Sequence, residues 1–238
     1  MGIKAELRPA SDRGHVDRGW LQSFHSFSFA DYYDPDHMGF GPLRVINEDI
    51  IAPGSGFDVH GHRDMEIITY LLAGELTHKD SMGNGSTLHT GDVQRMSAGM
   101  GVQHSEFNHS SKEHCHLLQI WIQPNVVGVP ASYEEKNFSA EEKRGHLRLI
   151  ASPEGTDGSI LIHQDARVYA ALLDSSENIA YPLHDGRLVY LHLVRGKATV
   201  NGQRLVAGDA LKISGGDALS IAQGAQAELL LFDLPAVW

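Results

Sequence analysis

The chain of 238 residues is long enough for one large β domain or two smaller ones, each with a hydrophobic core. Acidic residues outnumber basic residues by 30 to 19, and the net charge of −11 argues against a general nucleic-acid binder, which needs clustered Lys and Arg. No run of about 18 apolar residues is present, which argues against a membrane span, and the N-terminal residues lack the apolar stretch of a signal peptide.

Short β-branched and aromatic runs, separated by Gly, Asn, Asp and Ser, predict strands along most of the chain. In order they are "LRVINEDIIAP" (43–53), "EIITYLLAGELTHKD" (66–80), "HCHLLQIWIQP" (114–124), "HLRLIAS" (146–152), "RLVYLHLVRGKATVNGQ" (187–203) and "AELLLFDLP" (227–235). Many short strands with frequent turn signals are typical of a β-sandwich or β-barrel. We therefore expect an all-β fold.

One segment interrupts this pattern. Residues 132–145, "SYEEKNFSAEEKRG", are charged and poor in apolar side chains, which favours a linker or a brief helix. We expect an N-terminal domain at 1–130, a linker at 131–145 and a C-terminal domain at 146–238.

Two segments on either side of this linker repeat one order of strand, glycine, strand, turn, Gly-Asp and strand. Gly74 aligns with Gly196, and Gly91-Asp92 aligns with Gly208-Asp209. A module used twice predicts two related barrels. The second copy lacks the metal-type residues of the first, so we expect a metal site in the N-terminal domain alone.

Those metal-type residues alternate in two stretches. "FDVHGHRDMEIITY" (57–70) contains His60, His62 and Glu66, and "SAGMGVQHSEFNHSS" (97–111) contains His104 and Glu106. Alternating residues of a strand share one face, so the two stretches together supply three imidazoles and one carboxylate. Such a set suits Fe(II), Mn, Ni, Cu or Zn with open positions for water or substrate. The spacing leaves open whether Glu66 or Glu106 is the carboxylate ligand.

The same residues carry a family resemblance. Gly56, His60-x-His62-x-x-x-Glu66 and Gly74, followed by Gly91, Gly99, His104 and Asn108, resemble the two cupin motifs. The segments "GWLQSFHSFSFADYYDPDHMGFGPLRVIN", "HGHRDMEIITYLLAGELTHKDSMGN" and "MSAGMGVQHSEFN" resemble bacterial pirin-family proteins over most of residues 13–125. Beyond residue 146 the similarity lies mainly at the level of the fold.

The resemblance implies a bicupin, with two β-barrel domains of the jelly-roll type and metal only in the first. The ligands that it implies are His60, His62, His104 and Glu106, with Glu66 beside the ligands or acting as an acid on the substrate side. Glu106 and Glu66 are thus the candidate catalytic carboxylates. The cofactor that we expect is one divalent transition metal, Fe(II) first, with Zn, Mn, Ni, Cu or Co as alternatives. Four other histidines, His25, His78, His89 and His109, are expected in turns or at the rim.

Pirin-family members resemble quercetin 2,3-dioxygenases, which open the flavonol ring with O2 and release carbon monoxide. The function that we expect is therefore a flavonol dioxygenase. Two alternatives stay open: a metal-binding regulator that acts through a protein partner, and a dioxygenase for another enolisable small molecule. We expect a monomer without a nucleic-acid or membrane partner. The single cysteine, Cys115, allows no internal disulfide and favours the cytoplasm.

Overall fold

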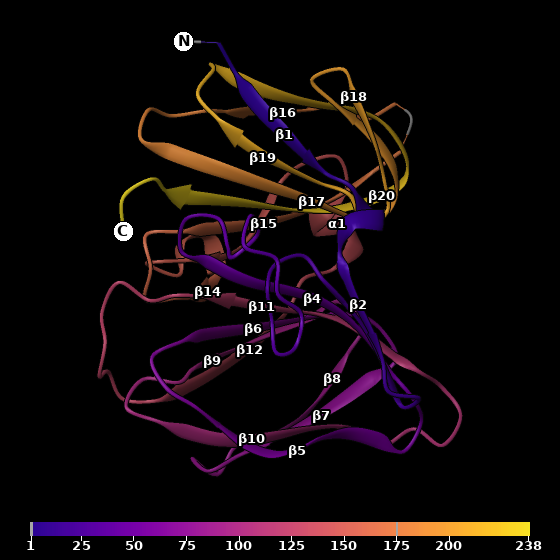
Figure 1. The fold of residues 1–238 in the computed structure, drawn as a ribbon, viewed down its shortest axis with the longest axis vertical. Coiled ribbons are helices and arrows are strands. Elements are labelled where there is room, and N and C mark those ends of the chain that lie inside the picture. Colours follow the sequence, from indigo (N-terminus) through magenta and orange to yellow (C-terminus); the bar gives the residue numbers. More distant parts are fainter. Residues whose placement is uncertain (1, 175) are drawn as a thin grey trace. The chain divides into compact units, whose positions relative to one another are not determined.

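A computed structural model describes residues 2–174 and 176–238, and strands account for most of them (Figure 1). The chain forms two compact units. The N-terminal unit comprises residues 14–137 and 160–164, and the C-terminal unit comprises the residues up to Arg13, 138–159 and 165–238. The expected all-β class is confirmed. Within the described residues, no helix has the length and apolar character needed to cross a membrane.

The N-terminal unit contains two sheets. Its strands are β2 (Gly14–Asp17), β3 (Leu21–His25), β4 (Leu43–Ile51), β5 (Ser55–His62), β6 (Glu66–Ala73), β7 (Glu75–Asp80), β8 (Gly85–His89), β9 (Asp92–Ser97), β10 (Val102–Asn108), β11 (Cys115–Ile122) and β12 (Ser132–Asn137), with the short β14 (Ile160–Leu161) in its second segment. One sheet has the order β5-β10-β7-β8 and the other β12-β9-β6-β11-β4-β3-β2, with antiparallel pairing throughout.

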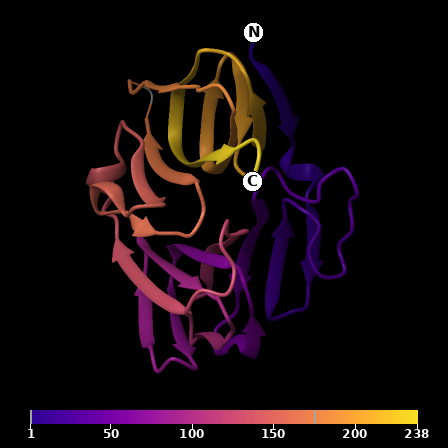
Figure 2. The same ribbon diagram turned by 90° about the vertical axis from the view of Figure 1, so that its left-hand side faces the viewer.

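The C-terminal unit has a long antiparallel sheet in which β1, β19, β17, β20, β15 and β13 follow one another. In Figure 2 its later strands are the orange to yellow ribbons, and β1 is the indigo strand next to the label N. Its elements are β1 (Lys4–Arg8), a 3₁₀ turn (Ala10–Asp12), α1 (Ala140–Lys143), β13 (Arg148–Ser152), a 3₁₀ turn (Thr156–Gly158), β15 (Arg167–Leu173), β16 (Ile179–Pro182), β17 (Arg187–Val200), β18 (Gln203–Val206), β19 (Ala210–Ser214) and β20 (Ala218–Pro235). Buried aliphatic side chains from β15 to β20, such as Leu191 and Leu229, fill its interior.

The two units share turn geometry at the positions that the sequence repeat aligns. Gly74 and Gly196 both adopt positive φ, at 78° and 70°. The carboxylate of Asp92 accepts a hydrogen bond from the backbone N–H of His89, and that of Asp209 accepts one from Val206, three residues back in each case. The repeated Gly-Asp therefore marks the same turn in both units.

The sequence limits of the two units differ from the expected domain boundaries. Residues 132–137, expected in the linker, form β12, which pairs with β9 from Ser132 opposite Ser97 to Asn137 opposite Asp92. This strand is charged because it lies at a sheet edge, where charged side chains are common. The N-terminal residues pair with β19, and residues 160–164 belong to the N-terminal unit. A short strand such as "KAELR" carries no signal for a partner 200 positions away.

Gly74 provides a test of this architecture. A Cβ at Gly74 would lie 2.5 Å from the carbonyl oxygen of His114, whereas one at Gly83, which also has positive φ, would meet nothing within 4 Å. Gly83→Ala should therefore show only backbone strain, about 1 kcal/mol, whereas Gly74→Ala should cost roughly 2 kcal/mol more. Urea denaturation of both variants measures the difference, and equal losses would contradict the close approach at Gly74.

Candidate metal centre

The three candidate histidines come from two paired strands of one sheet. β5 and β10 run antiparallel with His104 opposite His60, and the register shifts by one residue between His104 and Glu106. A bulge of this kind re-aims side chains and is common beside functional sites. Gly56 permits the close approach at this point, since a Cβ there would lie 2.3 Å from the carbonyl oxygen of Glu106. The two alternating stretches thus lie side by side in one sheet.

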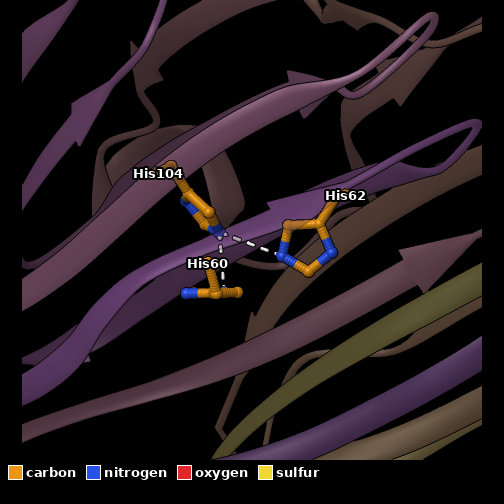
Figure 3. Close-up of side chains that lie close together, drawn as sticks. All are labelled: His60, His62 and His104. Atoms are coloured by element: carbon orange, nitrogen blue, oxygen red, sulfur yellow. Dashed lines mark hydrogen bonds between the residues drawn. The ribbon is translucent and has the colours of Figure 1, made fainter.

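The three imidazole rings point toward one another (Figure 3). The Nε2 atom of His104 lies 3.1 Å from Nε2 of His60 and 3.1 Å from Nε2 of His62. His104 is buried, His62 is partly buried and His60 is exposed, so the cluster reaches solvent on one side. Together they form a group able to hold a metal ion.

The protonation state of these rings favours the binding of a cation. The Nδ1 atom of His60 lies 2.8 Å from the carbonyl oxygen of Asp58, which accepts a hydrogen bond from Nδ1–H, so the Nε2 lone pair faces the cluster. Burial, with smaller effects of neighbouring histidines, lowers the pKa of His62 to about 4 and that of His104 to about 3. These two imidazoles are therefore neutral at pH 7, the form that binds metals.

The spacing of the nitrogens also fits a metal. A neutral imidazole nitrogen either donates or accepts one hydrogen bond, so Nε2 of His104 cannot satisfy both of its 3.1 Å neighbours. Nitrogens that bind one ion at about 2.0–2.1 Å in adjacent positions lie about 3 Å apart. The donor set therefore suits a divalent transition metal.

Glu106 lies deeper than the three imidazoles. Its side chain is 2% exposed, and it groups with His78 and His104 as a second possible set of metal-binding atoms. One carboxylate oxygen accepts hydrogen bonds from Gln94 at 2.6 Å and Thr69 at 3.2 Å, and the other accepts one from Gln119 at 2.9 Å. Burial raises the pKa of Glu106 against the lowering effects of nearby His78 and these hydrogen bonds.

Glu66, the other expected carboxylate, lies away from these groups. Its oxygens contact Ser97 Oγ at 2.8 Å and His163 Nδ1 at 3.2 Å, whereas Ile67, the next residue of β6, lines the cavity described below. Adjacent strand residues point to opposite faces, so Glu66 points away from the histidines. The expectation that it is a substrate-side acid therefore has no support in this geometry. Spacing could not reveal this, because Glu66 begins a new strand after His62.

Two histidines expected in turns or at the rim lie inside the unit. His78, fully buried on β7, lies 3.1 Å from Asp80 and stacks on Tyr133 with ring centroids 4.7 Å apart. His25, on β3, is 4% exposed and lines the cavity. The signal for His78 was its alternating position in "ELTHKD", in phase with Leu76 and Asp80 on one strand face.

A cavity of about 470 Å³ opens beside the histidines. His60, His62, His104 and Glu106 contribute to its wall, and aromatic side chains from several strands and loops line another part of it: Trp20, Phe29, Phe57 and Trp121. Ligand pockets for small organic molecules have about this size, roughly 300–1,000 Å³, and are lined mostly by apolar and aromatic groups. The candidate metal site therefore faces a space suited to an aromatic ligand.

His25 makes the stability of the metal-free protein depend on pH. Burial, with smaller effects of Arg18 and His15, lowers its pKa from 6.5 to about 4. The unfolded chain therefore binds the proton first, so the stabilisation is complete above pH 6.5 and is lost as the pH falls toward 4. The melting temperature should fall over this range, and less steeply in His25→Gln, as measured by circular dichroism at stepwise pH. An identical slope in both proteins would contradict this assignment.

Comparisons with known proteins agree with this structure. The Pirin family model matches residues 6–122, and that of the quercetinase C-terminal cupin domain matches residues 149–234. The chain is 46% identical over 231 residues to quercetin 2,3-dioxygenase of Escherichia coli, covering 97% of this chain and 99% of that protein. The crystal structure of YhhW from Escherichia coli has a TM-score of 0.94 at 46% identity, covering 98% of this chain and 99% of that one. The structure of YhhW in complex with nickel(II) has a TM-score of 0.94 at 45% identity, covering 98% and 100%.

The two β units share their turn geometry, and one of the units carries the converging imidazoles. This arrangement defines a bicupin. Its histidine cluster and the nickel(II) complex of a relative support a divalent metal in the N-terminal unit. The chain belongs to the pirin family, and curated relatives bear the name quercetin 2,3-dioxygenase.

Proposed function

We propose that this protein is a metal-dependent dioxygenase that cleaves the central ring of quercetin-type flavonols with O2 and releases carbon monoxide. The observation that carries the proposal is the cavity of about 470 Å³, in which three converging imidazoles and a buried carboxylate meet aromatic walls. The name shared by the curated relatives points to the same reaction.

His60, His62, His104 and Glu106 would hold the metal, and we propose Fe(II) as the native ion. The bound ion would lower the pKa of the flavonol 3-hydroxyl and so promote its ionisation. This donor set also accepts Zn, Mn, Ni, Cu or Co, so availability decides which ion is bound.

The protein's own groups would position the substrate and take its proton. The carboxylate of Glu106, which lines the cavity beside the imidazoles, would accept the proton of the 3-hydroxyl. Hydrogen bonds from Gln94, Thr69 and Gln119 fix the orientation of that carboxylate. Trp121, whose ring stands edge-on to His62 with centroids 5.0 Å apart, would hold the planar substrate beside the imidazoles.

A balanced reaction gives the test three readouts. Both atoms of O2 enter the ester product, and the ring carbon that bears the hydroxyl leaves as carbon monoxide. The Fe(II)-loaded protein should therefore bleach quercetin, consume O2 and release carbon monoxide in equal amounts, and a chelator should abolish all three.

The rate then separates catalysis from incidental chemistry. A kcat/KM above about 10⁴ M⁻¹s⁻¹, the low end for enzymes, supports the proposal. Bleaching without carbon monoxide would exclude this ring cleavage. A value far below this range would favour another enolisable substrate or a regulatory role through a protein partner.

A further inference from the structure

One wall of the cavity is polar although it is buried. Ser23 and His25 on β3 lie opposite Asp49 and Asn47 on β4, and all four side chains line the cavity. Each is 3–4% exposed. These strands belong to the sheet β12-β9-β6-β11-β4-β3-β2, whereas His60, His62 and His104 belong to the sheet β5-β10-β7-β8. The polar wall and the cluster of His60, His62 and His104 therefore lie on different sheets.

The proton arrangement in this wall follows from three groups. The Nε2 atom of His25 lies 2.8 Å from Ser23 Oγ, and Ser23 also hydrogen-bonds the carboxyl group of Asp49. Burial raises the pKa of Asp49 to about 7, so its carboxyl group is mostly ionised only above this pH. Serine has one proton, so with Asp49 ionised the hydroxyl donates to that carboxylate and accepts from Nε2–H of His25. The Nδ1 atom of His25 then carries a lone pair and is an acceptor.

Three acceptors in this wall lack hydrogen-bond partners within the part of the chain that the structure describes. They are Nδ1 of His25, Oδ1 of Asn47 and Oδ1 of Asp49, each with almost no exposed surface. We call these three residues the acceptor wall. Nε1 of Trp121, also in the cavity lining, is a donor without a partner among the described residues. Unsatisfied buried acceptors reduce stability, and they indicate a ligand that supplies donors.

We propose that the acceptor wall of His25, Asn47 and Asp49 binds hydroxyl groups of the substrate, so that the enzyme selects aromatic compounds that carry several hydroxyls. This inference rests on the proposed function where it places one end of the ligand at the imidazoles. Phenolic hydroxyls are hydrogen-bond donors on a flat apolar frame, which matches the acceptors and the aromatic lining together.

The preference can be measured as binding, without turnover. The protein is loaded with nickel(II), the ion found in a relative, and is titrated without O2 by tryptophan fluorescence. Quercetin and 3-hydroxyflavone serve as probes because they share the 3-hydroxyl and 4-carbonyl and differ in the other hydroxyls. The wild-type protein should bind quercetin at least about 10-fold more tightly.

Two variants locate the preference in the wall. Asn47→Leu and Asp49→Leu keep the approximate shape and remove the acceptor, so each should weaken quercetin binding about 5- to 10-fold and leave 3-hydroxyflavone binding within about twofold. The matched control is Glu48→Met, between them on β4, whose side chain pairs with His116 outside the cavity lining. Asn47→Leu should also raise the melting temperature of the ligand-free protein, because it removes an unsatisfied acceptor.

Each result has a clear consequence. Equal wild-type affinities for the two probes, or equal losses for both probes in both variants, would overturn the inference. Selective binding in this titration, together with no O2 consumption by the Fe(II)-loaded protein, would refute the proposed function and leave the acceptor wall in place. Turnover of both probes with equal kcat/KM and equal affinity would support the proposed function and refute the acceptor wall.

Discussion

Replacing His104 with alanine should lower metal affinity at least about 100-fold and leave the purified protein nearly free of metal. His104 is expected to have the largest effect because its Nε2 atom lies 3.1 Å from both His60 and His62, and its side chain is almost fully buried. Elemental analysis after dialysis against a weak chelator measures the loss, and flavonol turnover should disappear with the metal.

His116→Ala is the matched control for this variant. His116 lies on β11 in the same unit, where it pairs with Glu48 at 3.0 Å rather than with the cluster. It should retain a full equivalent of metal. If the His104 variant also retained one equivalent with unchanged affinity, the metal would have to be bound elsewhere.

The sequence predicted the imidazole cluster because strand periodicity is local. His60 and His62, like His104 and Glu106, alternate within single strands, so their shared faces follow from spacing alone. Which strand pairs with which is a long-range property that the resemblance to cupins supplied. Glu66 shows the limit of spacing: the chain leaves β5 after His62 and starts β6 at Glu66, and the alternation does not carry across the break.

Glu106→Gln and Glu66→Gln should give opposite results, although the chemical change is the same. We expect Glu106→Gln to weaken metal binding about 10-fold or more, because an anionic ligand becomes neutral. Glu66→Gln should keep metal affinity within about twofold but lower the free energy of unfolding by about 1–3 kcal/mol, since the buried carboxylate loses its charge-assisted bond to His163. Metal titration and urea denaturation of both variants measure the two effects.

The reverse pattern, with metal lost from the Glu66 variant and kept by the Glu106 variant, would make Glu66 the ligand after all. It would also require β6 to turn over relative to the arrangement seen here, because Ile67 now occupies the cavity side.

The acceptor wall could not be predicted from the sequence, for a different reason. A buried Asn or Asp in a strand predicts a partner, and only the structure shows that Asn47 and Asp49 each keep one oxygen without a partner among the described residues.

The pairing of β1 with β19 has a consequence for the newly made chain. The backbone N–H of Ala10 donates to Asp209, which lies 199 positions later in the sequence. At about 5–20 residues per second, the ribosome completes that partner about 10–40 s after the first strand. During this interval β1 is an unpaired strand that could join other chains. Its sequence, "KAELR", places Lys4, Glu6 and Arg8 at alternating positions, and such charges discourage pairing with the wrong strand.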